Sequence, residues 1–242
     1  MAISKFLCNC EQVKLRITNG KTVRKISDLP DDFTVTYHAG AMHTKPNTLQ
    51  SIICALDHGA KTVEFDVSFR PDGTPVIIHN SSPEANQGVL LSEALDIVAA
   101  NKSCKINLDL KSTANLAEVD RLIKERGLFE RVFYTGVFED WVEKVKKDSA
   151  IPYYLNHSIS NEDAASPEKI QALADKAKAL GAMGINSKFT NATKMFVDMI
   201  RENGLLISLW TVNKASDMLR VIDLAPDNIT TKKPHIIELL IK

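Results

Sequence analysis

From about residue 33 onward, the chain alternates short runs rich in β-branched and apolar residues with longer segments in which apolar residues recur every three or four positions. The short runs have the length and composition of strands, and the longer segments have the period of amphipathic helices. The pattern predicts eight strands, at residues 33–38, 62–67, 105–110, 132–135, 152–155, 182–186, 205–210 and 228–230. Strands that alternate with helices in this way indicate repeated β-α units and a parallel sheet.

The segments between the strands predict eight helices, at residues 48–58, 90–101, 115–126, 139–147, 167–180, 191–203, 214–223 and 236–240. Glycine follows several of the predicted helix ends, where a residue in the left-handed conformation ends a helix favourably. In 242 residues, eight such units favour a single closed TIM-type (β/α)8 barrel over an open doubly wound sheet. The order of the elements is compatible with both.

Residues 1–31 precede the repeat, and we interpret them as an N-terminal extension to a barrel domain at residues 32–242. Residues 14–18 and 22–26 alternate polar and apolar side chains, and Asn19-Gly20 between them is a favoured hairpin turn. We therefore expect a small β-hairpin that covers the base of the barrel.

Composition narrows the class of protein. The 30 Lys and Arg residues balance the 30 Asp and Glu residues, so the net charge gives no indication of a nucleic-acid partner or an anionic membrane. No stretch approaches the roughly 18 apolar residues of a membrane span, and the first residues lack a signal-peptide core. We expect a cytoplasmic protein without an integral membrane segment; nothing in the sequence specifies an oligomeric state.

The four cysteines do not predict a disulfide framework in a chain of this length. Cys8 and Cys10 are the only close pair, and no second Cys or His pair stands at the spacing of a zinc site. We interpret all four as ordinary thiols.

Two carboxylates occupy one face of the second predicted strand. Glu64 and Asp66 are two residues apart, and side chains at that spacing in a strand point the same way. Burying two like charges on one face is unfavourable by several kcal/mol unless a cation lies between them. A divalent metal ion is the simplest resolution, whereas the same pair on an edge strand would be solvated.

Other chemically capable side chains fall at the ends of predicted strands, where the chemistry of β/α barrels gathers. His38 ends the first strand, Asp109 ends the third with Lys111 just beyond it, and Trp210 ends the seventh. His79 follows a short apolar run that a turn folds back toward the second strand. An alternative for Asp109 and Lys111 is a strand-end ion pair, and an alternative for Trp210 is core packing.

In order and spacing these positions resemble the glycerophosphodiester phosphodiesterase family, whose fold is a β/α barrel. The resemblance extends from about residue 33 to the C-terminus. The matching motifs are His38-Ala39-Gly40, Asn47-Thr48-Leu49, Glu64-Phe65-Asp66-Val67, Asp72-Gly73-Thr74-Pro75-Val76 with His79-Asn80, Asn107-Leu108-Asp109-Leu110-Lys111 and Trp210-Thr211-Val212-Asn213.

The resemblance implies a metal-dependent hydrolase in lipid metabolism that acts on a small-molecule phosphodiester, such as a deacylated phospholipid, and releases an alcohol and glycerol phosphate. It implies a metal site formed by Glu64, Asp66 and Asp109. Three hard oxygen ligands suit Ca²⁺ or Mg²⁺ better than zinc.

The resemblance also implies that His38 and His79 form the acid/base pair. In the family's mechanism a hydroxyl next to the ester attacks phosphorus while one histidine accepts its proton and the other protonates the leaving alcohol; water then opens the cyclic phosphate. Lys111 matches a family lysine that would contact the phosphate, and Trp210 is expected as a substrate-binding residue in the wall of the site.

This chain departs from the family pattern at several positions. Ala39 replaces the arginine of His-Arg-Gly, Pro46 replaces an acidic residue, and Lys232 stands where the late Thr-Asp-x-Pro motif has aspartate. Asp109 stands where the family typically has glutamate, so its carboxylate reaches about one methylene less far. The nearby Lys45 and His43 are candidates to replace the missing arginine.

These departures leave two alternatives open. The chain could be a degenerate barrel that binds a phosphodiester or polymer with little catalysis. It could also be a related lyase whose reaction stops at the cyclic phosphate.

Overall fold

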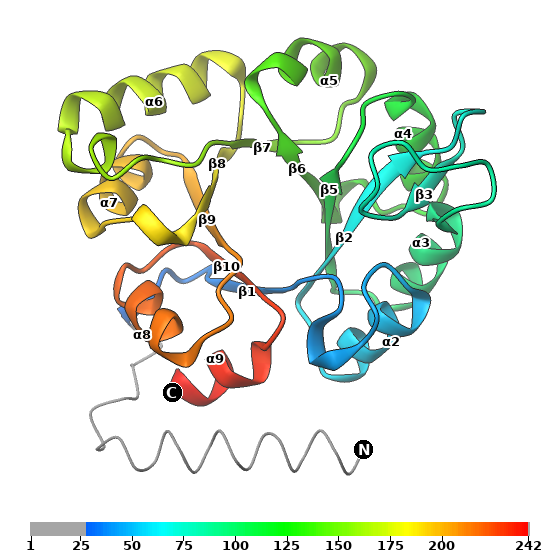
Figure 1. Cartoon of the computed structure of the whole chain (residues 1–242), viewed down its shortest axis with the longest axis horizontal. Coiled ribbons are helices and arrows are strands. Elements are labelled where there is room, and N and C mark those ends of the chain that lie inside the picture. The colour runs from blue at the N-terminus through cyan, green and yellow to red at the C-terminus, as the bar shows by residue number, and fades with distance from the viewer. Residues whose placement is uncertain (1–27, 242) are drawn as a thin grey trace.

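The computed structural model describes residues 28–241, and within them eight parallel strands surround a central axis (Figure 1). The barrel strands are β1 (Thr34–Tyr37), β2 (Thr62–Phe69), β5 (Lys105–Leu110), β6 (Val132–Val137), β7 (Tyr153–Asn156), β8 (Gly184–Lys188), β9 (Leu206–Trp210) and β10 (Asn228–Thr231).

Pairing between the first and second strands closes the sheet. β1 lies between β10 and β2, with Thr36 opposite Thr62 and Tyr37 opposite Val63. An open doubly wound sheet would end in two edge strands, whereas here β1 pairs with both β2 and the last strand β10, so this closure decides between the two predicted architectures. All eight predicted strands are confirmed, with each end within two residues of its predicted position.

Helices form an outer ring around the strands (Figure 1). They are α2 (Leu49–Asp57), α3 (Leu91–Ala100), α4 (Leu116–Glu125), α5 (Val142–Asp148), α6 (Pro167–Leu180), α7 (Lys194–Glu202), α8 (Ala215–Asp223) and α9 (Pro234–Leu240). Short 3₁₀ turns occupy Ala41–His43, Phe129–Arg131, Glu139–Trp141, Asp163–Ala165 and Phe189–Asn191.

Two helices begin three residues later than the sequence predicts, for identifiable reasons. The predicted start at residue 139 is a 3₁₀ turn, and the α-helix begins only at Val142. The predicted start at residue 191 lies before the N-cap Thr193, whose hydroxyl accepts a hydrogen bond from the Phe196 amide. An N-cap hydroxyl fixes where a helix begins, because it satisfies an amide that the helix itself leaves free.

A small antiparallel extension leaves the barrel at β2. β3 (Pro75–Ile77) pairs with the end of β2, with Val67 opposite Ile77, and β4 (Val89–Leu90) pairs with β3. The extension returns the chain to the carboxyl end of β2, as the turn at Asp72-Gly73 predicts. Through it, His79 is brought to the same end of the barrel as His38.

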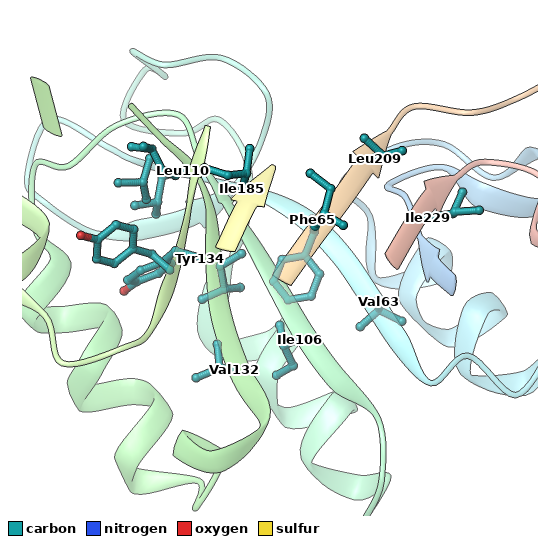
Figure 2. Packing of buried hydrophobic residues seen from close by; sticks show 14 of the residues in the cluster. Val63, Phe65, Ile106, Leu110, Val132, Tyr134, Ile185, Leu209 and Ile229 are labelled. Carbon is teal, nitrogen blue, oxygen red and sulfur yellow. The ribbon is translucent and has the colours of Figure 1, made fainter. Parts of the chain in front are cut away.

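Along each barrel strand one set of side chains packs outward beneath the helices and the alternate set points into the barrel. The outward set is apolar, and Figure 2 shows part of it, including Phe65, Ile106 and Tyr134. The inward set is largely polar: Asn228 accepts hydrogen bonds from the Thr36 and Thr34 hydroxyls and donates to Ser208. Hydrogen bonds thus satisfy these polar side chains inside the barrel.

The predicted hairpin at residues 14–26 lies outside the described residues. Within residues 28–241, none of the helices combines the length and apolar character needed to cross a bilayer.

Candidate active site

The carboxyl ends of the strands surround a cavity of about 460 Å³, to which every barrel strand, or the residue directly after it, contributes a side chain. All seven predicted site residues line this cavity: His38, Glu64, Asp66, His79, Asp109, Lys111 and Trp210. The structure thus brings together positions separated by more than 170 residues in the chain, as the barrel topology requires.

Strand register places the three predicted metal ligands side by side. Asp66 on β2 lies directly opposite Asp109 on β5, and Glu64 precedes Asp66 on the same face. One carboxylate oxygen from each residue lies within 4.8 Å of the other two. Glu64 and Asp66 are only 6% and 3% exposed, so solvent screens the repulsion between their charges only weakly.

The charge on Glu64 is strongly opposed by its surroundings. Burial raises its pKa well above the ordinary value, and the negative charges of Asp66 and Asp109 raise it further. A hydrogen bond of 2.7 Å from the Ala39 amide to Oε2 opposes the shift without cancelling it. Buried oxygen ligands with excess negative charge fit a hard divalent cation, which would relieve the repulsion.

Lys111 is held by two of the carboxylates. Its Nζ lies 3.0 Å from Asp66 Oδ1 and contacts Asp109 Oδ2 more closely still. Burial lowers the pKa of Lys111, but Asp109 and Asp66 outweigh that effect and raise it. The strand-end ion pair suggested by the sequence is therefore present, as part of the carboxylate cluster.

Asn47 fixes the orientation of Asp66 from both ends of its amide group. Its Nδ2 donates to Asp66 Oδ2 at 2.6 Å, and its Oδ1 accepts from the Asp66 backbone amide at 3.0 Å. Asn47 has a φ of 54°, in the left-handed region that asparagine tolerates better than most residues. The motif that contains Asn47 predicts no role for this residue, although its position just before the N-cap Thr48 marks a loop held in a special conformation.

Thr135 and Gly136 at the end of β6 support the other side of the cluster. The Thr135 hydroxyl lies 2.8 Å from both Asn107 Oδ1 and Asp109 Oδ1. Gly136 has a φ of +73°, and a Cβ there would lie 2.4 Å from the Leu110 carbonyl oxygen and 2.9 Å from Asp109 Oδ1. Only glycine lets the strands approach closely enough to hold Asp109 in place.

The hydrogen bonding of His38 defines its tautomer. Its Nδ1 lies 2.9 Å from the Ala39 carbonyl oxygen, and because a carbonyl only accepts, Nδ1 carries the proton. Burial lowers the pKa of His38, the nearby Lys232 lowers it further, and the Ala39 hydrogen bond partly opposes both. His38 is thus a neutral imidazole near pH 7, with Nε2 free to accept a proton.

His79 and Trp210 complete the predicted set. His79 lies just beyond β3 and is exposed, although it lines the cavity. Trp210 is positioned at the end of β9, and its indole Nε1 is buried without a hydrogen-bond partner among residues 28–241. A buried donor that faces no protein acceptor is available to a ligand.

An aromatic pair that the sequence does not predict as part of the site forms part of the cavity wall. Phe138 and Trp141 follow β6, and their rings meet edge to face with centroids 6.2 Å apart. Phe138 is 51% exposed, which is unusual for a large apolar side chain. The local sequence reads as the start of a helix, so it gives no signal that these rings reach the site.

Of the positions that depart from the family pattern or were expected to compensate for it, some line the cavity and others do not. Ala39 is buried beside Glu64 and brings no charge to the site. Lys45 and His43, the candidates to replace the missing arginine, are exposed and do not line the cavity. Lys232 does line it.

Comparisons with known proteins agree with this architecture. The model of the family described as Glycerophosphoryl diester phosphodiesterase family matches residues 38–86 and 81–236. A glycerophosphodiester phosphodiesterase of Caldanaerobacter subterraneus subsp. tengcongensis is 24% identical over 241 residues, which cover 86% of this chain and 97% of that protein.

Solved structures with the same fold include an Oleispira antarctica phosphodiesterase in complex with the product sn-glycerol-3-phosphate. It has a TM-score of 0.71 and 20% identity, with 88% of this chain and 97% of that chain covered. A glycerophosphodiester phosphodiesterase from Thermotoga maritima has a TM-score of 0.62 and 18% identity, with 86% and 96% covered. At these identities the likeness establishes the fold alone.

Proposed function

Because this chain belongs to the glycerophosphoryl diester phosphodiesterase family, and is thus a phosphoric diester hydrolase, we propose that it cleaves a glycerophosphodiester to an alcohol and glycerol phosphate with the help of a divalent metal ion. The Oleispira relative was solved with sn-glycerol-3-phosphate as its product, and we propose the same product class here. A deacylated phospholipid is the corresponding substrate, which gives the enzyme a role in lipid turnover.

Glu64, Asp66 and Asp109 are the proposed metal ligands. They supply the hard oxygen donors that Ca²⁺ or Mg²⁺ prefers, within 4.8 Å of one another. When bound, such an ion offsets negative charge on the phosphate oxygens as the transition state forms. Asn47 and Thr135 hold Asp66 and Asp109 in place for this role.

His38 is the proposed general base and His79 the general acid. Nε2 of neutral His38 accepts the proton of the glycerol hydroxyl next to the ester, whose oxygen then attacks phosphorus. His79, on the β3 extension of the rim, donates a proton to the oxygen of the leaving alcohol. In the second step of the reaction the two histidines exchange their acid and base roles, and water opens the cyclic phosphate.

Trp210, at the end of β9, and Lys111, just after β5, are the proposed substrate-binding residues. The unpartnered indole Nε1 of Trp210 donates a hydrogen bond to the substrate. Lys111 adds positive charge beside the phosphate while it remains paired with Asp66 and Asp109.

The observation that carries this proposal is that three carboxylates and two histidines, from separate elements, line one cavity in a chain of this family. The test is a panel of glycerophosphodiesters with different alcohols, assayed with added Ca²⁺, with Mg²⁺ and with a chelator. We expect turnover of at least one substrate, and we expect the chelator to abolish it.

Phosphorus NMR of the products separates the alternatives. Glycerol phosphate as the final product supports hydrolysis, and accumulation of a cyclic phosphate would identify a lyase instead. Turnover that persists in the chelator would refute the metal role. No turnover across the panel would identify a barrel that binds phosphodiesters without cleaving them.

A further inference from the structure

The fixed charges around the cavity leave the substrate's own charge uncompensated. When a divalent ion is bound and all three carboxylates are ionised, that ion and Lys111 would balance their three negative charges. A phosphodiester adds one negative charge, and more develops on the phosphate oxygens in the transition state. A further cation at the cavity is therefore needed to stabilise a bound phosphodiester.

Lys232 is, in addition to Lys111, a second lysine that lines the cavity. It directly follows β10, and alternation along that strand places it on the same inward side as Asn228 and Thr230. Its backbone is fixed on two sides: its amide donates to Asn213 Oδ1 at 2.9 Å, and its carbonyl accepts from the Met42 amide at 3.1 Å. The Lys232 side chain therefore enters the cavity from a fixed backbone position.

The two lysines differ in their partners. Lys111 Nζ contacts two carboxylates, whereas no carboxylate of residues 28–241 lies within 4.0 Å of Lys232 Nζ. Lys232 is half-buried, so its charge is only partly screened by solvent. Its charge already acts on neighbouring His38, whose pKa it helps to lower.

The loop beside Lys232 is the one that carries arginine in the family pattern. Lys232 contacts this loop through the Met42 amide, and the His38 amide donates to the carbonyl of Thr231. In this chain the arginine position is Ala39, and lysine occupies a position where the pattern has aspartate. The two departures together remove a positive charge from one strand end and add one at the neighbouring strand end.

We propose that Lys232 is a phosphate-binding residue of this enzyme, whose ammonium group binds a non-bridging oxygen of the substrate phosphate and replaces the guanidinium absent at Ala39. The identity of the substrate rests on the proposed function, but the anion site itself does not. An ammonium on a flexible stem provides a point charge to a phosphate oxygen without the forked geometry of arginine.

The experiment uses three variants of the full chain. Lys232→Met removes the charge and keeps most of the stem, and Lys232→Arg keeps a charge. Lys214→Met is the matched control, because Lys214 also follows a barrel strand at this end but is exposed and does not line the cavity. Calorimetry measures the binding of glycerol 3-phosphate to each Mg²⁺-loaded protein, and phosphorus NMR measures hydrolysis.

We expect Lys232→Met to weaken glycerol 3-phosphate binding and to raise KM by about 10- to 100-fold, the range for losing a charge-assisted hydrogen bond. Lys232→Arg should stay within about threefold of the wild type, since it retains a donor and a charge. Lys214→Met should bind like the wild type. Thermal melts of all variants confirm that they are folded.

The outcomes separate this proposal from the proposed function. Unchanged binding in folded Lys232→Met would overturn the role of Lys232, whatever the catalytic activity. If the wild type binds glycerol 3-phosphate but hydrolyses nothing, loss of binding in Lys232→Met supports the anion site while the proposed hydrolysis fails. A wild type that does not bind glycerol 3-phosphate would refute the anion site directly.

Discussion

On strand β2, Glu64 and Phe65 are neighbours in the chain and both are almost fully shielded from solvent, at 6% and 1% exposed. Phe65 packs into the apolar layer beneath the helices (Figure 2). Glu64 faces the interior of the barrel beside two further carboxylates, and its pKa is strongly raised by burial. Equal burial thus stabilises the protein on one face of the strand and opposes folding on the other.

Strand β5 repeats the arrangement. Ile106, Leu108 and Leu110 are buried in the apolar layer, while Asp109 and then Lys111 point to the cavity. Because adjacent side chains of a strand point to opposite faces, the same strands build the core and the site without sharing side chains. Substitutions on the two faces should therefore affect different properties, stability on the outer face and activity on the inner one.

The largest expected effect is on the inner face at His38. His38→Ala should lower kcat/KM by about 100- to 10,000-fold, the usual contribution of a general base. The thermal midpoint should change little, because the side chain is 24% exposed and is no part of the apolar core. Steady-state assays and a thermal melt on the same preparation measure the two quantities.

The control for His38 is His58→Ala. His58 is exposed at the end of α2, where its ring contacts the Cys54 carbonyl at 2.7 Å, and it does not line the cavity. Its loss should leave kcat/KM within about twofold of the wild type, as expected for a surface change away from special features. Full activity in His38→Ala would remove the histidine from the mechanism.

On the outer face, Phe65→Ala should lower the free energy of unfolding by about 3 to 5 kcal/mol, because it removes a large side chain from a filled core. The protein that remains folded should keep its metal affinity. Urea unfolding gives the first quantity, and calorimetry with Ca²⁺ below the unfolding transition gives the second.

Leu206→Ala is the comparison for Phe65, since Leu206 is apolar but 37% exposed and should be much less costly to truncate. If Phe65→Ala instead removed metal binding from a stable protein, the separation of the two faces of β2 would be wrong.

The smallest expected effect concerns pH and Glu64. Because its pKa is raised in the folded protein, Glu64 contributes stability while protonated, and the metal-free protein loses that contribution as pH rises through the raised pKa. Metal binding needs the carboxylate and releases the proton. Ca²⁺ affinity should therefore rise by up to about tenfold per pH unit below that pKa.

Calorimetry in two buffers with different ionisation enthalpies counts the released proton. Glu64→Gln cannot ionise, so it should bind metal more weakly and release no proton from this position. Its side-chain oxygen can still accept from the Ala39 amide, so the metal-free variant should be at least as stable as the wild type at alkaline pH. A metal affinity in the wild type that is independent of pH would contradict a protonated Glu64.

Much of the fold could be predicted because it depends on local pattern. Alternation along 62–67 and 105–110 and the helical period between strands identify β2, β5 and their neighbours. The errors are at boundaries, as at α7, where the N-cap hydroxyl of Thr193 sets the first turn. The β4 strand was missed because two residues carry no periodic signal.

The site was predicted less completely than the fold. Motifs identified seven of the residues that line the cavity, but the roles of Asn47 and Gly136 depend on contacts across the barrel. Such contacts join residues on different elements, and spacing along the chain does not encode them. The same holds for Lys232, which the sequence marked only as a departure.

The sequence by itself determined that strands and helices alternate, that Glu64 and Asp66 share a face, and that each motif residue falls at a strand end. These follow from the two-residue and 3.6-residue periods, which are properties of neighbouring positions. Only the tertiary structure decided that Asp66 lies opposite Asp109, that Lys111 pairs with both, and that Lys232 reaches the cavity without a carboxylate partner. The closure of β1 on β2 and the register of parallel strands set these distances, and both are fixed by packing across the whole barrel.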